Sequence, residues 1–387
     1  MARLYSHLFY LLFASPVLSP AVGDTSVYLY LLVPLVDPHF LRELGSRPIE
    51  RRHALAALLF VAASVPYGSV LFLFKVVSVV VCAAYMAYTA RQGFFYLYGY
   101  VALNVGVALV QAVGVLGFGA ELLFPAAIGE FLYGAYALPT GPPPTGAEGL
   151  LMAFRFSGLS REPGFFAALL IGSFVLLVDD RSVPRRRTLL AAHALGLVLS
   201  FSKVSVSFFL VFPFAWLLRR AVDRVPKWAV VGGVLGGMMV VTQAMYGVHG
   251  ADFINQSFLH RTIGYAVVPE LPARDLWLGV GFRNAASRAA EVPLLRQGLW
   301  FEDRPGVVVA GSGLSSVVID HGLLYFALLV FLLYLLRVRS YPLLLFLVMT
   351  INENPLTSQS FVLLGIYYLL RDSERRSREA PSATAPG

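Results

Sequence analysis

The sequence predicts an all-α polytopic integral membrane protein with about twelve transmembrane helices, or ten to eleven if the shortest apolar runs do not span. Three observations predict this class. The chain is 58% hydrophobic and 13% charged, whereas a soluble protein carries roughly twice that charged fraction. Apolar runs of about 15 to 25 residues recur along the chain, as transmembrane helices require. Basic residues lie in the short loops between these runs, which the positive-inside rule assigns to the cytoplasm.

Residues 1–115 contain the first five predicted helices. We expect them near 4–20, 25–40, 54–66, 69–89 and 93–115. Arg3 and the apolar run behind it also fit a cleaved signal peptide. A second apolar run follows within a few residues, which favours a retained helical hairpin.

Residues 116–162 form the first of two sizeable predicted periplasmic loops. The Pro139–Gly146 stretch is too rich in glycine and proline to be helical. The loop ends in the segment Arg155-Phe156-Ser157-Gly158-Leu159-Ser160-Arg161-Glu162-Pro163. Pro163 suits the first turn of the next helix, because its missing N–H is not needed there.

The second half of the chain holds the remaining seven predicted helices and the second large loop, and no internal repeat is evident. Residues 163–248 hold helices near 163–179, 188–201, 204–218 and 228–248. Residues 249–313 form the second periplasmic loop. Residues 314–370 hold helices near 314–336, 341–351 and 358–370, and residues 371–387 form a disordered cytoplasmic tail. With this assignment every basic loop falls on the cytoplasmic side.

The net charge of +8 does not indicate nucleic-acid binding, because the basic residues follow the topology of the loops. No spacing of His, Cys, Asp and Glu resembles a metal site, and we expect neither a metal nor a cofactor. Cys82 is the single cysteine, which excludes an intramolecular disulfide.

The segment from Arg155 to Pro163 is the main indication of function, because ionisable groups near lipid are costly. The forked guanidinium groups of Arg155 and Arg161 suit a phosphate or pyrophosphate. Free N–H groups at the start of the next helix favour an anion at the same place. The alternative is a membrane boundary, where arginines reach lipid headgroups and Glu162 favours the positive end of the helix.

Three other places supply candidate binding residues. Lys203 stands alone between two apolar runs, where it contacts either lipid phosphate or an anionic ligand. The loop 249–313 holds six arginines and six acidic residues, which predicts a folded cap of short amphipathic helices that presents selected arginines. The selected arginines are Arg261, Arg283 and Arg288. His321 is a further candidate, although a lone histidine in an apolar run more often packs between helices.

This arrangement resembles the superfamily of O-antigen polymerases (Wzy-type) and O-antigen ligases, which are polytopic membrane glycosyltransferases. The resemblance covers the architecture from the fifth predicted helix to the twelfth. The residues that carry it are Arg155, Gly158, Glu162 and Pro163, followed by Ser202-Lys203 at the next outer turn. A dominant outer loop before the last helices completes the pattern.

The resemblance implies polymerisation of undecaprenyl-pyrophosphate-linked repeat units at the periplasmic face of a bacterial inner membrane, without a metal. It implies that arginines engage the pyrophosphate. We assign this role to Arg155 and Arg161, with help from Lys203 and Arg261, and Glu162 is the candidate base. The expected partners are the lipid-linked donor and acceptor glycans and the bilayer, and the family implies a chain-length regulator.

One departure separates polymerase from ligase. Ligases of this superfamily typically carry a His-Asn pair shortly before the glycine of the helix that follows the large loop. The corresponding stretch here, Gly311-Ser312-Gly313 ahead of Gly322, has neither residue. The departure favours a polymerase and leaves the general base without a firm assignment.

Three alternatives remain open. The first is a ligase that passes the glycan to lipid A core or to a protein. The second is a flippase or transporter of lipid-linked oligosaccharide, although transporters usually place ionisable residues in broken helices at mid-membrane, and the charges here gather in outer loops. The third is a multi-span glycosyltransferase that uses a lipid-phosphate sugar. It needs an acidic pair in the first outer loop, where only Asp24 is present.

Overall fold

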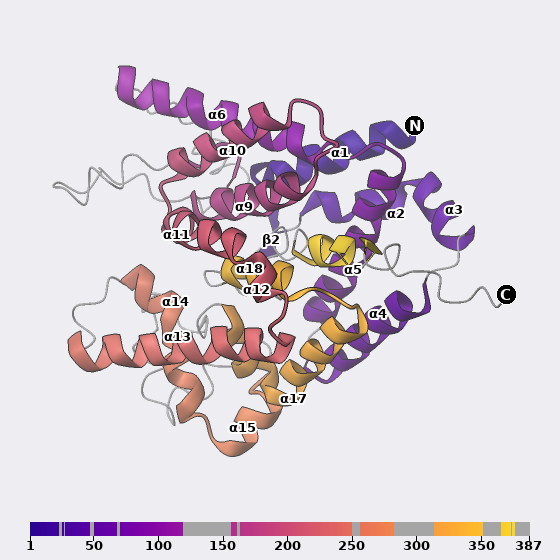
Figure 1. The fold of residues 1–387 in the computed structure, drawn as a ribbon. Helices are drawn as coiled ribbons and strands as arrows, with labels where there is room; N and C mark the ends of the chain where they lie inside the picture. Colours follow the sequence, from indigo (N-terminus) through magenta and orange to yellow (C-terminus); the bar gives the residue numbers. More distant parts are fainter. Residues whose placement is uncertain are drawn as a thin grey trace. The chain divides into compact units, whose positions relative to one another are not determined.

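The computed structural model describes residues 1–22, 25–26, 28–46, 50–67, 70–118, 156–160, 163–249, 256–281, 313–350, 365–372 and 374–375. Within these residues the protein is helical, apart from two-residue strands β1 (Ala21–Val22) and β2 (Thr25–Ser26), which pair antiparallel. Figure 1 draws these helices as coiled ribbons, coloured along the sequence. The chain divides into two compact units. Unit 1 comprises Met1–Pro48 and Val81–Leu210, and unit 2 comprises Ile49–Val80 and Val211–Gly387.

Among the described residues, four helices are long and apolar enough to cross a membrane. They are α5 (Val70–Arg91), α6 (Leu97–Phe118), α13 (Lys227–His249) and α17 (Gly313–Leu335). α5, α6 and α13, of 22 or 23 residues, extend about 33 to 35 Å, enough for a hydrocarbon core of about 30 Å. The prediction of an all-α protein with membrane-spanning helices is thus confirmed for these four helices. The total of about twelve spans remains a prediction.

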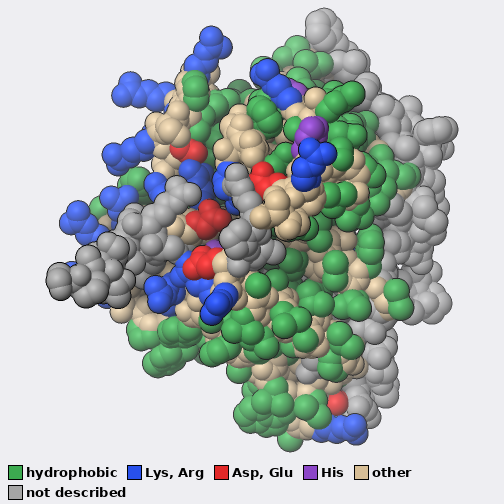
Figure 2. All heavy atoms as spheres, turned by 90° about the vertical axis from the view of Figure 1, so that its right-hand side faces the viewer, with side chains coloured by type: hydrophobic (Ala, Val, Ile, Leu, Met, Phe, Trp, Pro, Cys, Tyr) green, Lys and Arg blue, Asp and Glu red, His purple; other side chains and the backbone are tan. Residues whose placement is uncertain are grey.

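Hydrophobic side chains cover broad areas of the face drawn in Figure 2, and the charged side chains gather in part of it. Large apolar side chains on the predicted spans are exposed, for example Val110 at 59% and Val240 at 69%. An exposed apolar surface of this kind is unfavourable in water and suits contact with lipid.

Unit 1 is built around three helices that pack together. They are α6, α9 (Pro163–Asp179) and α10 (Arg186–Ser200). A Cβ at Gly196 of α10 would come within 2.7 Å of Val105 and 3.0 Å of Leu170, so glycine permits this close packing. Ser173 of α9 and His193 of α10 are both buried and lie 2.8 Å apart, which joins the same two helices by a hydrogen bond.

The first predicted helix is shorter than expected, and the second is not observed. α1 (Ala2–Ala14) is followed by the 3-10 turn η1 (Pro16–Leu18). Residues 25–40 contain β2, the turn η2 (Leu29–Leu31), the single-turn helix α2 (Val33–Val36) and the start of α3 (Pro38–Ser46). The predicted helix 25–40 is therefore wrong, and the reason is local.

Pro34 and Pro38 interrupt the hydrogen bonding that a continuous helix needs. Asp37 between them is buried, and its carboxylate accepts a hydrogen bond from the N–H of His39 at 3.0 Å, which caps α3. The hydroxyl of Tyr85 donates to the same carboxylate at 2.9 Å. The carboxylate of Asp37, which caps α3, thus also joins α3 to α5 through Tyr85.

Segments that the sequence assigns to the cytoplasmic side contact one another in unit 1. The Glu43 carboxylate lies 3.5 Å from the Arg91 guanidinium and accepts a hydrogen bond from Gln92 at 2.9 Å. Arg3 donates to the hydroxyl of Tyr96 at 2.8 Å. These contacts involve the N-terminus, the segment around Glu43 and the segment 91–96. The distribution of basic residues predicts that all three lie on the cytoplasmic side.

Unit 2 contains the remaining described helices. They are α4 (Arg51–Ser64), η3 (Val65–Tyr67), α12 (Arg219–Val222), α13, α14 (Gln256–Val267), η6 (Val268–Glu270), α15 (Ala273–Leu278), α17, α18 (Ser340–Thr350) and the helical segment 365–372. Two helices have one end in each unit, α5 and α11 (Lys203–Leu217). Apart from α1 and the segment 25–40, the longer observed helices lie close to the predicted ranges. α12, α14 and α15 are short helices within segments predicted as loops.

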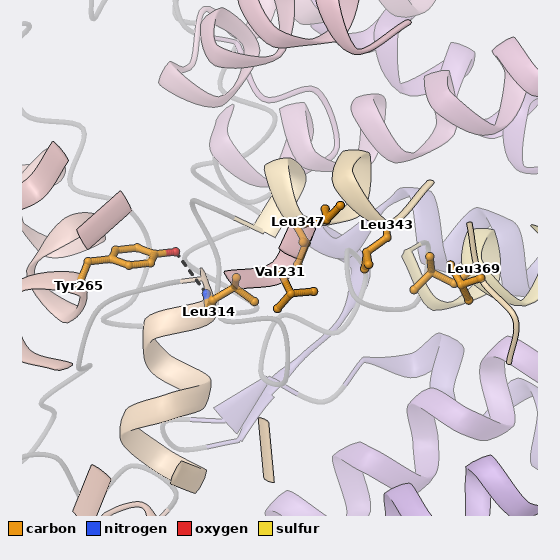
Figure 3. Close-up of a cluster of buried hydrophobic side chains, with 8 residues drawn as sticks. Val231, Tyr265, Leu314, Leu343, Leu347 and Leu369 are labelled. Atoms are coloured by element: carbon orange, nitrogen blue, oxygen red, sulfur yellow. Dashed lines mark hydrogen bonds between the residues drawn. The ribbon is translucent and has the colours of Figure 1, made fainter. Parts of the chain in front are cut away.

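The core of unit 2 joins α13, α14, α17 and α18. Its buried side chains include Val231, Tyr265, Leu314, Leu343, Leu347 and Leu369 (Figure 3). The N–H of Leu314 donates to the hydroxyl oxygen of Tyr265 at 3.2 Å. Burial raises the pKa of Tyr265 to about 12, so the phenol stays neutral. Part of the predicted loop 249–313 is therefore a helix buried against the spans.

Candidate functional site

The turn Phe156–Ser160, at the centre of the predicted motif, is held inside unit 1. Gly158 has a left-handed backbone, with φ of +57°. The N–H of Gly158 donates to Oε1 of Gln111 at 2.9 Å, and Nε2 of Gln111 donates to the Gly158 carbonyl at 3.0 Å. Buried backbone groups need partners within the protein, and one side chain of α6 supplies both.

Asn104 holds the next residue of the turn. Its Oδ1 accepts a hydrogen bond from the N–H of Leu159 at 2.7 Å, and its Nδ2 donates to the Ala14 carbonyl at 2.7 Å. The Leu159 carbonyl in turn accepts the N–H of Val17 at 3.1 Å. Asn104 and Gln111 are two helical turns apart and share one face of α6. That face fixes the turn and ties it to the end of α1.

No side chain fits at position 158. A Cβ there would overlap Oδ1 of Asn104 and lie 2.7 Å from the Asn104 carbonyl oxygen. The left-handed conformation also disfavours every residue with a Cβ. The glycine of the predicted motif is thus required by the turn itself.

The turn between α10 and α11 adjoins this segment. The N–H of Phe156 donates to the Leu199 carbonyl at 3.0 Å. Hydrogen bonds of 2.6 and 3.0 Å link three buried hydroxyls in the second turn, those of Ser200, Ser205 and Ser202. Lys203 is the first residue of α11, but its side chain lies outside the described part. The segment 156–160 thus contacts the end of α10, at a residue three positions before Ser202.

Most other candidate residues lie outside the described residues. These are Arg155, Arg161, Glu162, Arg283 and Arg288. Arg261 belongs to α14, whose backbone is described there although the Arg261 side chain is not. Arg155 and Arg161 directly precede and follow the held turn in the sequence, and Pro163 begins α9 as predicted.

His321 is buried in unit 2, with 1% of its surface exposed. Its ring centroid lies 4.9 Å from that of Tyr325, whose hydroxyl is 2.9 Å from the hydroxyl of Ser64 on α4. These contacts are those of a residue packed between helices. A ligand-binding role for His321 remains a proposal.

His321 also adjoins a break in α17. Gly322 has φ of 77° and ψ of 171°, so two helical segments meet there. The carbonyls of Ile319 and Asp320 accept hydrogen bonds from the N–H groups of Val280 and Gly281, at 2.9 and 3.0 Å. The segment after α15 thus supplies partners for carbonyls that a continuous helix would satisfy internally.

Comparison with known proteins gives no assignment. No protein-family model, curated protein or solved structure matches this chain. The held turn and the broken helix are therefore the two features from which function is inferred.

Within the described ranges, no group of three or more His, Cys, Asp and Glu side chains could hold a metal ion. Among the described residues, the side chains that bind the turn at 156–160 are neutral amides, those of Gln111 and Asn104. Such groups fix a backbone and do not transfer protons at neutral pH. The chemistry proposed below is therefore assigned to the charged residues on either side of the turn.

Sequence inspection missed Asn104 and Gln111. The available signal was the presence of two amides in the otherwise apolar run of α6, because polar side chains in a membrane helix usually face protein and have partners. The pairing of these amides with a turn 47 and 55 residues away could not be read from the helix alone.

Proposed function

We propose that this protein polymerises undecaprenyl-pyrophosphate-linked oligosaccharide repeat units into O-antigen or a related surface polysaccharide. The reaction is a metal-independent glycosyl transfer at the periplasmic face of a bacterial inner membrane. The enzyme is a multi-pass glycosyltransferase, its substrates are two lipid-linked glycans, and a chain-length regulator is a possible partner.

The observation that carries this proposal is the turn at 156–160. Two permanently charged guanidinium groups flank it in the sequence, and α6 holds its backbone through Gln111 and Asn104. Preorganised cations stabilise the charge that develops on a leaving pyrophosphate without reorganising during the reaction. A rigid turn between two arginines supports that kind of preorganisation.

In the proposed reaction a hydroxyl of the acceptor repeat unit attacks the anomeric carbon of the donor glycan. The bond between that carbon and the pyrophosphate oxygen breaks, and a glycosidic bond forms. Arg155 and Arg161 neutralise the departing undecaprenyl pyrophosphate, with Lys203 as a further cation. Glu162 accepts the proton of the attacking hydroxyl. Arg261, Arg283, Arg288 and His321 are proposed to bind glycan or pyrophosphate.

The test uses purified protein in nanodiscs with lipid-linked repeat units and no added metal, with products separated as a gel ladder. Arg155→Ala is expected to slow ladder formation by about a hundredfold, the usual cost of removing one charge-stabilising group. Arg187→Ala is the matched control, because Arg187 is an exposed arginine of a predicted cytoplasmic loop.

A full-rate ladder from Arg155→Ala would remove that arginine from the mechanism. Wild type that yields no ladder, but transfers a single glycan to lipid A core, would identify a ligase instead. Both assays use the repeat unit that the protein's own cell makes as the lipid-linked substrate.

One observation favours a second candidate, a flippase of lipid-linked oligosaccharide. α17 is broken at Gly322 beside buried Asp320 and His321, and transporters often bind substrates at such discontinuous helices. Proteoliposomes with a fluorescent lipid-linked oligosaccharide and an external quencher would report flipping. Flipping by wild type that is lost in His321→Ala, without any ladder, would select this candidate.

A further inference from the structure

A basic and aromatic surface lies around α12 in unit 2. We define the α12 patch as residues 216–228, which connect α11 with α13. Its basic residues are Arg219, Arg220, Arg224 and Lys227, and its aromatic residues are Trp216 and Trp228. The three arginines are exposed.

The single carboxylate of the α12 patch is already engaged. Oδ1 of Asp223 accepts the N–H of Tyr341 at 2.9 Å, and Oδ2 lies 3.9 Å from the Arg339 guanidinium. In the described parts of the chain, no carboxylate forms an ion pair with the three arginines of the patch. Within the described residues, Arg219, Arg220 and Arg224 therefore present positive charges that no carboxylate pairs with.

Aromatic rings hold two of the cations in place. The Arg219 guanidinium lies 4.8 Å from the ring centroid of Trp216, and the Lys227 ammonium lies 4.3 Å from that of Tyr334 on α17. Such contacts restrict the long side chains. Because tryptophan and tyrosine prefer the boundary between lipid and water, these contacts favour a position of the two cations at that boundary.

The patch also has an apolar part that a soluble anion would leave uncovered. Leu217 is 77% exposed and Trp228 is 64% exposed. An occupant that covers them must combine an anionic group with an apolar body. An anionic phospholipid has both, because its phosphate accepts hydrogen bonds from guanidinium groups and its acyl chains cover apolar side chains.

We propose that the α12 patch binds the headgroup of an anionic phospholipid in the adjacent leaflet. The guanidinium groups of Arg219, Arg220 and Arg224 contact the phosphate, and Leu217 and Trp228 contact the acyl region. This site is independent of glycosyl transfer and requires no lipid-linked glycan.

The test is native mass spectrometry of the delipidated full chain, with phosphatidylglycerol or phosphatidylcholine added back. Wild type is expected to retain phosphatidylglycerol in preference. The triple variant R219Q/R220Q/R224Q is expected to lose affinity for phosphatidylglycerol by about fivefold per arginine, while binding of phosphatidylcholine stays unchanged.

The matched control is R181Q/R185Q/R187Q, which removes three exposed arginines from a basic loop that has no aromatic residue. It is expected to retain phosphatidylglycerol as wild type does. Equal losses in the two triple variants would overturn the proposal, because net charge alone would then explain retention. The single variants R220Q and R224Q repeat the test if the triple variant does not fold.

A further arm separates lipid from a free anion. Inorganic phosphate at the same phosphate concentration is expected not to displace phosphatidylglycerol, and Trp228→Ala is expected to weaken lipid retention. Displacement by inorganic phosphate, with Trp228→Ala indistinguishable from wild type, would show a soluble-anion site and contradict the lipid proposal.

Discussion

At Gly158 two independent constraints act on one residue. Its left-handed backbone admits a Cβ only at a cost, and the space that a Cβ would occupy belongs to Asn104. Gln111 binds the N–H and the carbonyl of the same residue. Any side chain at this position therefore strains the backbone and separates the turn from α6.

Gly158→Ala is expected to lower the free energy of unfolding by about 2–4 kcal/mol, from the left-handed conformation and from overpacking together. Equilibrium unfolding of the detergent-solubilised protein measures this loss. Gly106→Ala on α6 is the control, because a Cβ there meets nothing within 4 Å, and alanine in a helix is favourable. Equal stability of the two variants would contradict the close contact at Gly158.

The sequence identifies the residues of the turn more readily than the side chains of α6 that bind it. Gly158 and Pro163 stand out in the sequence, because glycine and proline have restricted uses at turns and helix starts. Asn104 and Gln111 do not, because an amide in an apolar helix has several possible partners. Only the folded chain shows that both amides serve the same turn.

At the scale of single elements, α17 shows how a helix in an apolar run is interrupted. The run from 314 to 336 predicts one continuous helix, and the break at Gly322 was not expected. Gly279 and Gly322 approach so closely that a Cβ on either would overlap backbone atoms of the other segment. The carbonyls released by the break find N–H partners at Val280 and Gly281.

The effect of Gly322→Ala on stability distinguishes a broken α17 from a continuous one. In a continuous helix this substitution would stabilise the protein by about 0.5–1 kcal/mol. With the break it is expected to destabilise by about 2–4 kcal/mol, because φ of 77° is strained and the Cβ overlaps the Trp277 carbonyl oxygen. The measurement is the unfolding free energy in detergent.

Gly236→Ala on α13 serves as the comparison, since a Cβ at Gly236 meets nothing within 4 Å. A Gly322→Ala protein as stable as Gly236→Ala would mean that α17 is continuous. That result would also remove the observation that favours the flippase candidate.

At the scale of the molecule, loops assigned to the cytoplasm by their basic residues meet within unit 2. Arg339 donates to Asp372 through Nε at 2.6 Å and lies 3.9 Å from Asp223. Ser340 donates to the Val225 carbonyl at 2.5 Å. Burial lowers the pKa of Arg339, but the charges of Asp372 and Asp223 outweigh it and the net pKa is raised. One arginine thus joins three loops.

Arg339→Gln is expected to cost about 2–4 kcal/mol of unfolding free energy, because it leaves the buried Asp372 carboxylate without its cation. Asp372→Asn in the same chain is expected to recover part of the loss, which a double-mutant cycle measures as a coupling energy. Arg337→Gln, at an exposed arginine two positions earlier, is expected to change stability little. Strictly additive losses for the first two changes would exclude the ion pair as the cause.

The sequence by itself determined the helical membrane class and most helix ranges. These depend on the length and composition of local apolar runs, which any segment carries without its neighbours. The wrong prediction of a helix at residues 25–40 also has a cause within the segment itself, because Pro34, Pro38 and the capping Asp37 lie within the apolar run.

The tertiary structure alone decided how the turn at 156–160 and the break at Gly322 are accommodated. Backbone groups that leave a helix in apolar surroundings must find partners elsewhere in the chain. Those partners are Gln111 and Asn104 for the turn, and Val280 and Gly281 for the break. Their identity depends on which distant segments pack together, and no local pattern in the sequence records that.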